Sequence, residues 1–126
     1  MLHVTCAIIE NDKKILICQR SERMKLPLKW EFPSGKIEDR ESKEDCLKRE
    51  IRDELGLEIE VETAFTPVEH HYPELSLCLY PFLCRWTGGS LVIAEHAHAI
   101  WIEKNELQNY DWAEADVLIM KELLSL

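Results

Sequence analysis

The sequence lacks the features that mark membrane, secreted and multidomain proteins. No apolar run is long enough to cross a bilayer. The N-terminus has neither a basic leader nor a small-residue cleavage site, and strand-like sequence begins at once. Internal repeats, low-complexity segments and linkers are also absent. We therefore expect one cytoplasmic domain, residues 1–126, with no membrane partner.

Positive charge is scarce. The chain has 15 Lys and Arg residues against 24 Asp and Glu residues, which gives a formal net charge of −9. No stripe of Lys and Arg with interleaved aromatic residues is present. Such a surface repels nucleic-acid backbones, so we expect no nucleic-acid partner. If the partner is itself an anion, a cation has to mediate the contact.

Cysteine pairs and complete zinc ligand sets are missing as well. The five cysteines are an odd number without a Cys-x-x-Cys pair, and Cys6, Cys18 and Cys46 lie among apolar neighbours. This pattern favours buried thiols over disulfides or metal ligands. Four histidines suggest a zinc site: His70, His71, His96 and His98. No fixed set of Cys or Glu ligands accompanies them, so zinc is disfavoured.

Hydrophobic periodicity predicts strands and helices in alternation. Five strands are expected, over residues 2–10, 15–20, 57–65, 75–86 and 99–103. Residues 29–32 are compatible with a further short strand, and helices are expected at 42–56 and 112–126. This order indicates an α/β (α+β) fold with helical layers around a mixed sheet.

The first helix has clear signals at both ends. Ser42 opens it in a variant of the capping box, with Asp45 where Glu or Gln is usual. Leu47, Ile51 and Leu55 recur at a spacing of four and form one apolar stripe. The residue after Leu55 is a glycine, which is well placed to end the helix.

Three acids crowd the last turns of this helix. At 100° per residue, Glu50, Asp53 and Glu54 share one face about 100° wide. Their mutual repulsion costs roughly 0.2–0.5 kcal/mol per pair, and they also oppose the helix dipole. One interpretation is a solvated charged face, and the other is a site for a divalent cation, which prefers oxygen ligands. The spacing alone leaves both open.

The wider pattern resembles the Nudix box of nucleoside-diphosphate-linked-moiety hydrolases. The segment runs Gly35, five residues, Glu41, seven residues, and then Arg-Glu-Ile-Arg-Asp-Glu-Leu-Gly-Leu over residues 49–57. Every constrained position matches except Asp53, where the box has Glu. The preceding Trp-Glu-Phe-Pro-Ser-Gly-Lys is similar to MutT-type members, although Ser34 replaces a glycine.

The resemblance covers essentially the whole chain. Segments after the box, "HHYP", "EHAHAIW" and "WAEADVLIMKEL", fall in the same order as in MutT-type members. It implies the Nudix α/β/α sandwich, with a mixed β-sheet between helices. It also implies that Glu41 and Arg49 form an ion pair that joins the loop to the helix and acts as structural support.

The resemblance also implies a metal site. Glu50 and Glu54 would ligate Mg²⁺, with Mn²⁺ as an alternative ion, and Asp53 would support the cluster. The carbonyl of Gly35 would add an oxygen ligand. Glu95 stands where MutT-type members carry a further loop carboxylate, and its alternative role is a plain surface acid.

The implied reaction is attack of water on a nucleoside triphosphate. Metal ions neutralise the phosphate oxygens and lower the pKa of the water, and a carboxylate takes its proton. Glu50 is the first candidate for this catalytic base, with Glu54 and Glu95 as rivals. Crowded carboxylates raise one another's pKa while a bound metal lowers it, so the sequence does not decide among them.

Four residues are candidates for binding the nucleotide. Arg20 lies where the family places a phosphate-binding arginine. Lys36 is either a second phosphate contact or an exposed, solubilising lysine, and Tyr72 either stacks on the base or packs at a rim. Asp116 falls where MutT-type members read the base, and an N-cap role is its alternative. An ionised Asp accepts hydrogen bonds only, from guanine N1–H and N2–H₂ or from the cytosine N4 amine.

We therefore expect a Mg²⁺-dependent enzyme that cleaves a nucleoside triphosphate to the monophosphate and pyrophosphate. Sanitation of 8-oxo-dGTP is the leading prediction, and a pyrophosphohydrolase for CTP, dCTP or modified dCTP follows. Leu75 departs from the 8-oxo-dGTP pattern, because MutT-type members have an arginine there. A nucleotide sensor without turnover is a third hypothesis. The molecule is expected to be a monomer or a homodimer.

Overall fold

The computed structural model describes all residues, 1–126, as eight strands, two α-helices and one 3₁₀-helix. The strands are β1 (Leu2–Asn11), β2 (Lys14–Gln19), β3 (Trp30–Glu31), β4 (Ser34–Lys36), β5 (Leu57–Ala64), β6 (Val68–Tyr72), β7 (Leu75–Gly89) and β8 (His98–Glu103). The helices are α1 (Lys43–Leu55), η1 (Lys104–Asn109) and α2 (Glu114–Leu124). None of them has the length and hydrophobicity needed to span a bilayer.

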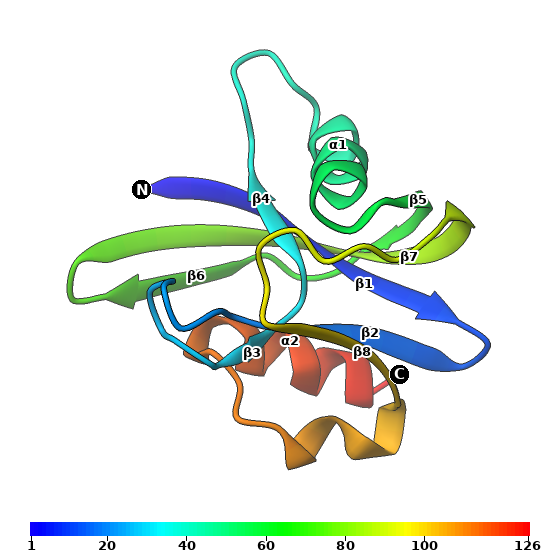
Figure 1. Ribbon diagram of the computed structural model, residues 1–126. Helices are drawn as coiled ribbons and strands as arrows, with labels where there is room; N and C mark the ends of the chain where they lie inside the picture. Colours follow the sequence, from blue (N-terminus) through cyan, green and yellow to red (C-terminus); the bar gives the residue numbers. More distant parts are fainter.

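The sheet is mixed, and β1 lies at its centre (Figure 1). β1 runs parallel to β7 from Leu2 to Glu10, and it pairs antiparallel with β4 on its other side. β2 meets β1 only near the hairpin turn, and then separates to pair with β3 and β8. The two parts of the sheet, β2–β3–β8 and β1–β4–β7, therefore diverge from this hairpin.

Alternation along the strands builds two cores. Ala7 and Ile9 of β1 face α1 and pack with its Leu47, Ile51 and Leu55. The other face of β1 and β2 packs against α2 in a second cluster, whose members include Cys6, Ile8, Ile15, Ile17, Ile119 and Leu123. Each helix covers one face of the sheet, which confirms the predicted α/β/α sandwich.

The signals that delimit α1 act as predicted. Ser42 Oγ accepts a hydrogen bond from the Asp45 N–H at 3.1 Å, and the chain leaves the helix at Gly56 with φ of 69°. The Gly56 N–H donates to the Arg52 carbonyl at 3.0 Å. α2 begins two residues later than predicted, after an extended Ala113.

Three short elements were not predicted. β4 and β6 extend the sheet, and η1 follows β8. β4 has only three residues, and β6 has the sequence Val-Glu-His-His-Tyr, in which apolar and polar residues give little periodicity. All five thiols are free, and four of them are buried: Cys6, Cys18, Cys46 and Cys84.

Candidate active site

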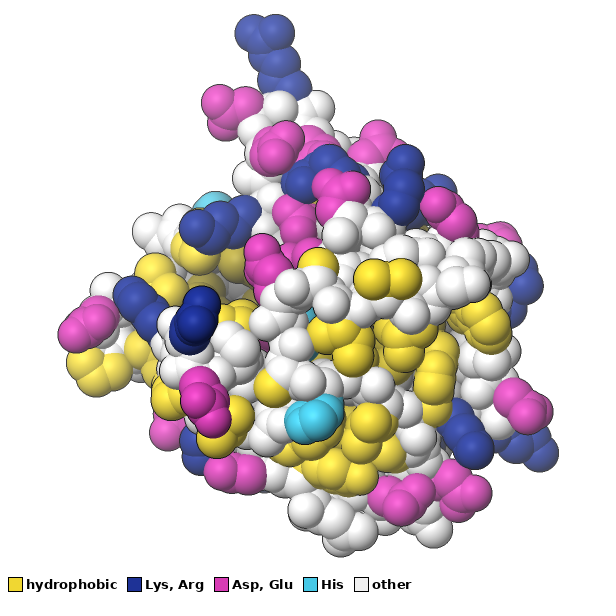
Figure 2. All heavy atoms as spheres, viewed as in Figure 1, with side chains coloured by type: hydrophobic (Ala, Val, Ile, Leu, Met, Phe, Trp, Pro, Cys, Tyr) yellow, Lys and Arg dark blue, Asp and Glu magenta, His cyan; other side chains and the backbone are white.

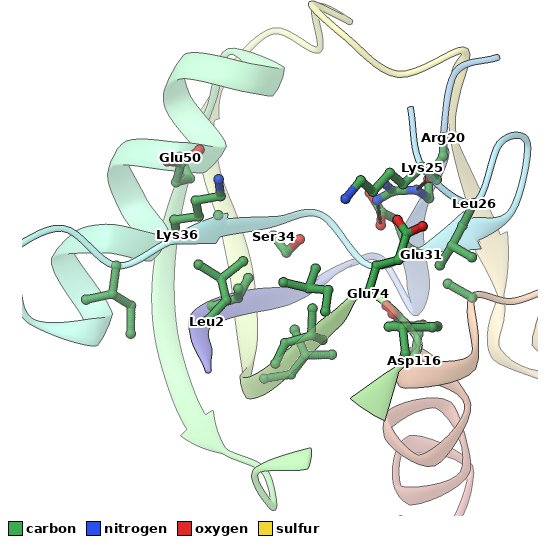
Figure 3. Close-up of a pocket in the computed structure, with 18 of the residues that line it drawn as sticks. Leu2, Arg20, Lys25, Leu26, Glu31, Ser34, Lys36, Glu50, Glu74 and Asp116 are labelled. Carbon is green, nitrogen blue, oxygen red and sulfur yellow. Dashed lines mark hydrogen bonds and ion pairs between the residues drawn. The ribbon is translucent and has the colours of Figure 1, made fainter. Parts of the chain in front are cut away.

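A cavity of about 1190 Å³ is lined by residues from both parts of the sheet and from both α-helices. Its wall carries seven of the residues predicted from the sequence to act in the site: Arg20, Gly35, Lys36, Glu50, Glu54, Tyr72 and Asp116. Figure 3 shows Glu50 and Lys36 on one side of the cavity, with Arg20, Glu31 and Asp116 on the other. Residues up to 96 positions apart in the chain therefore share one pocket.

Glu50 lies directly over Gly35. A Cβ atom added to Gly35 would collide with Glu50 Cγ and would stand 2.7 Å from Glu50 Oε2. The backbone of β4 is therefore in contact with this carboxylate only because residue 35 has no side chain. Arg49 Nη1 donates to Glu50 Oε1 at 2.8 Å, which orients the carboxylate further.

Glu54 is one turn further along α1 and more enclosed. Burial is the largest cause that raises its pKa to about 8, followed by its hydrogen bond with Glu50 and the negative charges of Glu50, Glu95 and Glu31. Its Oε2 atom is buried without a hydrogen-bond partner. A buried carboxyl oxygen of this kind is stabilised by a cation, which would also reverse the rise in its pKa.

Arg49 and Glu41 join the loop before α1 to the helix. Arg49 Nε donates to Glu41 Oε2 at 2.7 Å, and Nη2 donates to Glu41 Oε1 at 2.9 Å. This bidentate geometry is the strongest form of an Arg–carboxylate contact. Arg49 Nη2 also lies 3.3 Å from the Lys36 carbonyl, so the same guanidinium spans the loop, β4 and α1.

Two of the predicted metal ligands do not line the cavity. Asp53 is exposed, because it is rotated from Glu50 in the direction opposite to Glu54 and leaves the cavity side of α1. The Glu95 side chain is also exposed. Its loop is nevertheless anchored to the end of α1, since the Ala94 N–H donates to the Glu54 carbonyl at 3.2 Å. Figure 2 shows acidic side chains gathered over α1, with basic ones between them.

The structure contains no group of three or more His, Cys, Asp and Glu side chains that could hold a metal ion. The predicted cluster of three acids is therefore reduced to the pair Glu50 and Glu54. This pair still fits a hard divalent cation. Mg²⁺ is commonly bound by one or two carboxylates together with waters and substrate phosphates. The partnerless Glu54 Oε2 and the adjacent Gly35 backbone provide such an all-oxygen environment.

Glu31 is a site residue that the sequence analysis missed. Arg20 Nη1 donates to Glu31 Oε1 at 2.7 Å, and His96 Nε2 lies 2.9 Å from Glu31 Oε2. The signals in the sequence were its place in the Trp-Glu-Phe-Pro-Ser-Gly-Lys segment, which is similar to MutT-type members, and its position between Trp30 and Phe32. His96, considered above only as a zinc ligand, is thus a partner of a buried carboxylate.

Asp116 is buried in the first turn of α2, at the cavity wall. Its Oδ2 accepts a hydrogen bond from the Phe32 N–H at 2.9 Å. Burial above all, and then the charge of Glu31, raise the pKa of Asp116 well above its ordinary value. The N-cap alternative for Asp116 is wrong, because the capping residue of α2 is Ala113.

The remaining predicted residues surround the same cavity. The Tyr72 hydroxyl accepts a hydrogen bond from the Ala115 N–H at 3.0 Å, which fixes its ring against the start of α2. Lys36 is exposed at the rim, where Lys25 adds a second ammonium group. Leu75 lies at the tip of the β6–β7 hairpin, in the apolar part of the wall. The cavity lining thus combines basic, acidic and apolar side chains, with Arg20, Lys25 and Lys36 as its basic residues.

Comparison with known proteins places the chain in a family. The NUDIX domain family matches residues 4–122. The CTP pyrophosphohydrolase of Escherichia coli K12 is 35% identical over 129 residues, which cover 100% of this chain and 93% of that protein. The 8-oxo-dGTP diphosphatase of Proteus vulgaris is 34% identical over 83 residues, covering 65% of this chain and 74% of that protein.

The same relationship holds in three dimensions. The solution structure of the E. coli ORF135 protein matches with a TM-score of 0.88 at 32% identity, covering 100% of this chain and 90% of that one. Fold, family match and full-length similarity therefore agree with the resemblance seen in the Nudix box. The chain belongs to the Nudix family and is a nucleoside triphosphate pyrophosphohydrolase.

Proposed function

We propose that this enzyme hydrolyses cytidine triphosphates, CTP or dCTP, to the monophosphate and pyrophosphate, with Mg²⁺ as its metal ion. Nudix enzymes typically depend on a divalent metal. The structural observation behind the preference for cytosine is the buried carboxyl of Asp116 on the cavity wall. The full-length similarity to a CTP pyrophosphohydrolase supports the same substrate.

Asp116 is enclosed in the cavity wall, and the nearby cation does not neutralise it, since Arg20 is paired with Glu31. Burial raises its pKa well above the ordinary value, which favours the neutral carboxylic acid. Because Oδ2 already accepts from the Phe32 N–H, the proton is placed on Oδ1. Asp116 then offers one donor and one acceptor to the substrate.

This pair of groups complements cytosine. The Oδ1–H can donate to N3 of the base, while Oδ2 accepts from the N4 amine. The N1–H and N2–H₂ pair of guanine needs an ionised carboxylate, but the O6 and N1–H pair of guanine matches the neutral acid as cytosine does, so nucleotide kinetics has to separate the two bases. From the sequence Asp116 was expected to be ionised, and its burial instead favours the neutral form, which adds cytosine N3 to the atoms that it can contact. Leu75 adds an apolar contact where MutT-type members have arginine.

The other side chains of the cavity act on the triphosphate. Arg20 and Lys36 bind phosphate oxygens, and Glu50, Glu54 and the Gly35 carbonyl hold the metal. Bound Mg²⁺ supplies charge neutralisation and lowers the pKa of the attacking water. We assign proton removal to Glu50, which lies on the cavity wall against Gly35; Glu54 lines the same cavity and is the remaining rival, whereas Glu95 lies outside the cavity.

A second candidate substrate is 8-oxo-dGTP. It is favoured by the similarity to the diphosphatase of Proteus vulgaris, which covers 65% of this chain. The two candidates separate in a pyrophosphate-release assay with Mg²⁺ and four nucleotides, CTP, dCTP, dGTP and 8-oxo-dGTP. We expect the highest kcat/KM with CTP or dCTP. A clear preference for 8-oxo-dGTP would reject the cytosine proposal.

Substitution of Asp116 tests the protonation state directly. Asn presents an amide donor beside a carbonyl acceptor, as the neutral acid presents a hydroxyl donor beside a carbonyl, so Asp116→Asn is expected to keep kcat/KM for CTP within about fivefold. Asp116→Ala leaves the base edge unpaired and should lower kcat/KM about 100-fold. If Asp116→Asn is as impaired as Asp116→Ala while both fold normally by circular dichroism, the neutral-acid argument is wrong.

A further inference from the structure

Glu31 lies at the centre of a buried polar network beside the cavity. Only 6% of its surface is exposed, and both of its carboxylate oxygens are occupied. Oε1 accepts from Arg20 Nη1 at 2.7 Å, and Oε2 lies 2.9 Å from His96 Nε2. One contact on each oxygen holds the carboxylate of Glu31 in a single orientation.

Arg20 is held from a second direction. Its Nε–H donates to the Lys25 carbonyl, while Nη1 is bound by Glu31. A guanidinium is planar, so two contacts on different nitrogens fix its orientation. The Arg20 side chain lines the cavity, and its remaining N–H groups are not used by Glu31 or Lys25. Figure 3 shows Arg20 and Glu31 together on the wall that faces Glu50.

His96 connects this network to the acidic end of α1. Its side chain is only 3% exposed, and it belongs to the loop between β7 and β8. That loop is attached to both sides of the site: the Ala94 N–H donates to the Glu54 carbonyl at 3.2 Å, and the Ala97 N–H donates to the Gln19 carbonyl at 2.9 Å. The imidazole therefore contacts Glu31 from a backbone that is fixed at both ends.

We propose that Glu31 is a positioning residue that holds the Arg20 guanidinium in its phosphate-binding orientation, and that His96 holds Glu31 in place. Preorganisation of this kind removes the cost of ordering a flexible arginine when the triphosphate binds. The inference rests on the proposed role of Arg20, but it does not depend on which base the enzyme prefers.

A double-mutant cycle tests whether Glu31 acts through Arg20. We expect Glu31→Gln to lower kcat/KM about tenfold, mainly by raising KM, and to the same extent for CTP and 8-oxo-dGTP. In the Arg20→Ala background the same substitution should have almost no further effect. Glu60→Gln is the matched control, because it breaks the exposed Glu60–Arg85 pair on β5 and β7 away from the cavity.

Three results would overturn the inference. Additive effects of Glu31→Gln and Arg20→Ala would mean that Glu31 acts independently of Arg20. Loss of activity with one nucleotide only would indicate a contact with the base. An Arg20→Ala variant with normal kcat/KM would remove the phosphate role itself, while the nucleotide preference measured in wild type still decides the proposed function.

Substitution of His96 keeps the inference testable if Glu31→Gln does not fold. Gln can place its amide nitrogen near the position of His96 Nε2, whereas Ala cannot. We expect His96→Gln to keep most of the activity and His96→Ala to raise KM about as much as Glu31→Gln. Equal loss in both variants, with unchanged melting temperatures, would contradict the role of His96.

Discussion

At the scale of single residues, the missing side chain of Gly35 matters as much as the acids around it. Because Glu50 occupies the space above Gly35, a methyl group there forces the carboxylate away. We expect Gly35→Ala to lower kcat about 100-fold, since displacement of a catalytic group by about 1 Å is enough for such a loss. Steady-state kinetics with saturating Mg²⁺ measures this effect.

Gly88→Ala is a suitable control for that experiment. A Cβ at Gly88 would meet only Glu58 Cβ, at 3.9 Å, which is an ordinary contact. This variant should keep normal kcat, and circular dichroism should show that both variants are folded. Near-normal turnover by Gly35→Ala would mean that Glu50 does not need its position over β4.

Residue spacing located the box residues, but it could not predict the shifted pKa of Asp116 or the contacts of Glu31 with Arg20 and His96. The acids of α1 lie on one helix, so their separation follows from helical geometry. Glu31 instead acts through Arg20 and His96, the latter 65 positions away in the chain. The protonation of Asp116 depends on burial, which only the folded structure defines.

At the scale of elements, the Glu41–Arg49 ion pair attaches the loop after β4 to α1. The hydrogen bond from Arg49 is the largest cause that lowers the pKa of Glu41 to about 2. A lowered pKa means that the ionised form stabilises the fold, and this contribution is lost as pH falls from about 4.5 to about 2. Glu41→Gln should therefore be less stable than wild type near neutral pH.

Urea unfolding at several pH values measures this difference. The gap between wild type and Glu41→Gln should be largest at about pH 7, should shrink below about pH 4.5 and should close as pH approaches about 2. A gap that is independent of pH would mean that packing of the Glu41 side chain, and not its charge, supports the loop.

The long elements were predictable and the short ones were not. β1, β2, β7 and α1 carry enough alternating or stripe-forming residues for their type to be read directly. β4 and β6 exist because neighbouring strands offer them hydrogen bonds, through β1 and β7 respectively. Such tertiary pairing leaves no periodic signal in three to five residues.

At the scale of the whole molecule, the acidic wall makes stability depend on both pH and metal. The raised pKa of Glu54 means that its protonated form favours folding. This contribution is complete below pH 4.5 and is lost as pH rises to about 8. A divalent cation that binds the ionised pair compensates for the loss, so Mg²⁺ should raise the melting temperature more at about pH 8 than at about pH 5.

Thermal melts with Mg²⁺ or EDTA at both pH values measure this coupling. Glu54→Gln provides the control, because it removes the titrating group and should abolish most of the difference between the two pH values. A stabilisation by Mg²⁺ that is equal at both pH values, or absent altogether, would contradict a metal site at Glu50 and Glu54.

The alternation of β1 between the two hydrophobic clusters has a consequence for the way the molecule comes apart. Cys6 and Ile8 belong to one cluster, and their immediate neighbours Ala7 and Ile9 belong to the other. β1 therefore cannot leave one hydrophobic cluster without also leaving the other. We expect denaturation in a single cooperative transition, in which the region of Glu50 and Glu54 and the region of Asp116 unfold together.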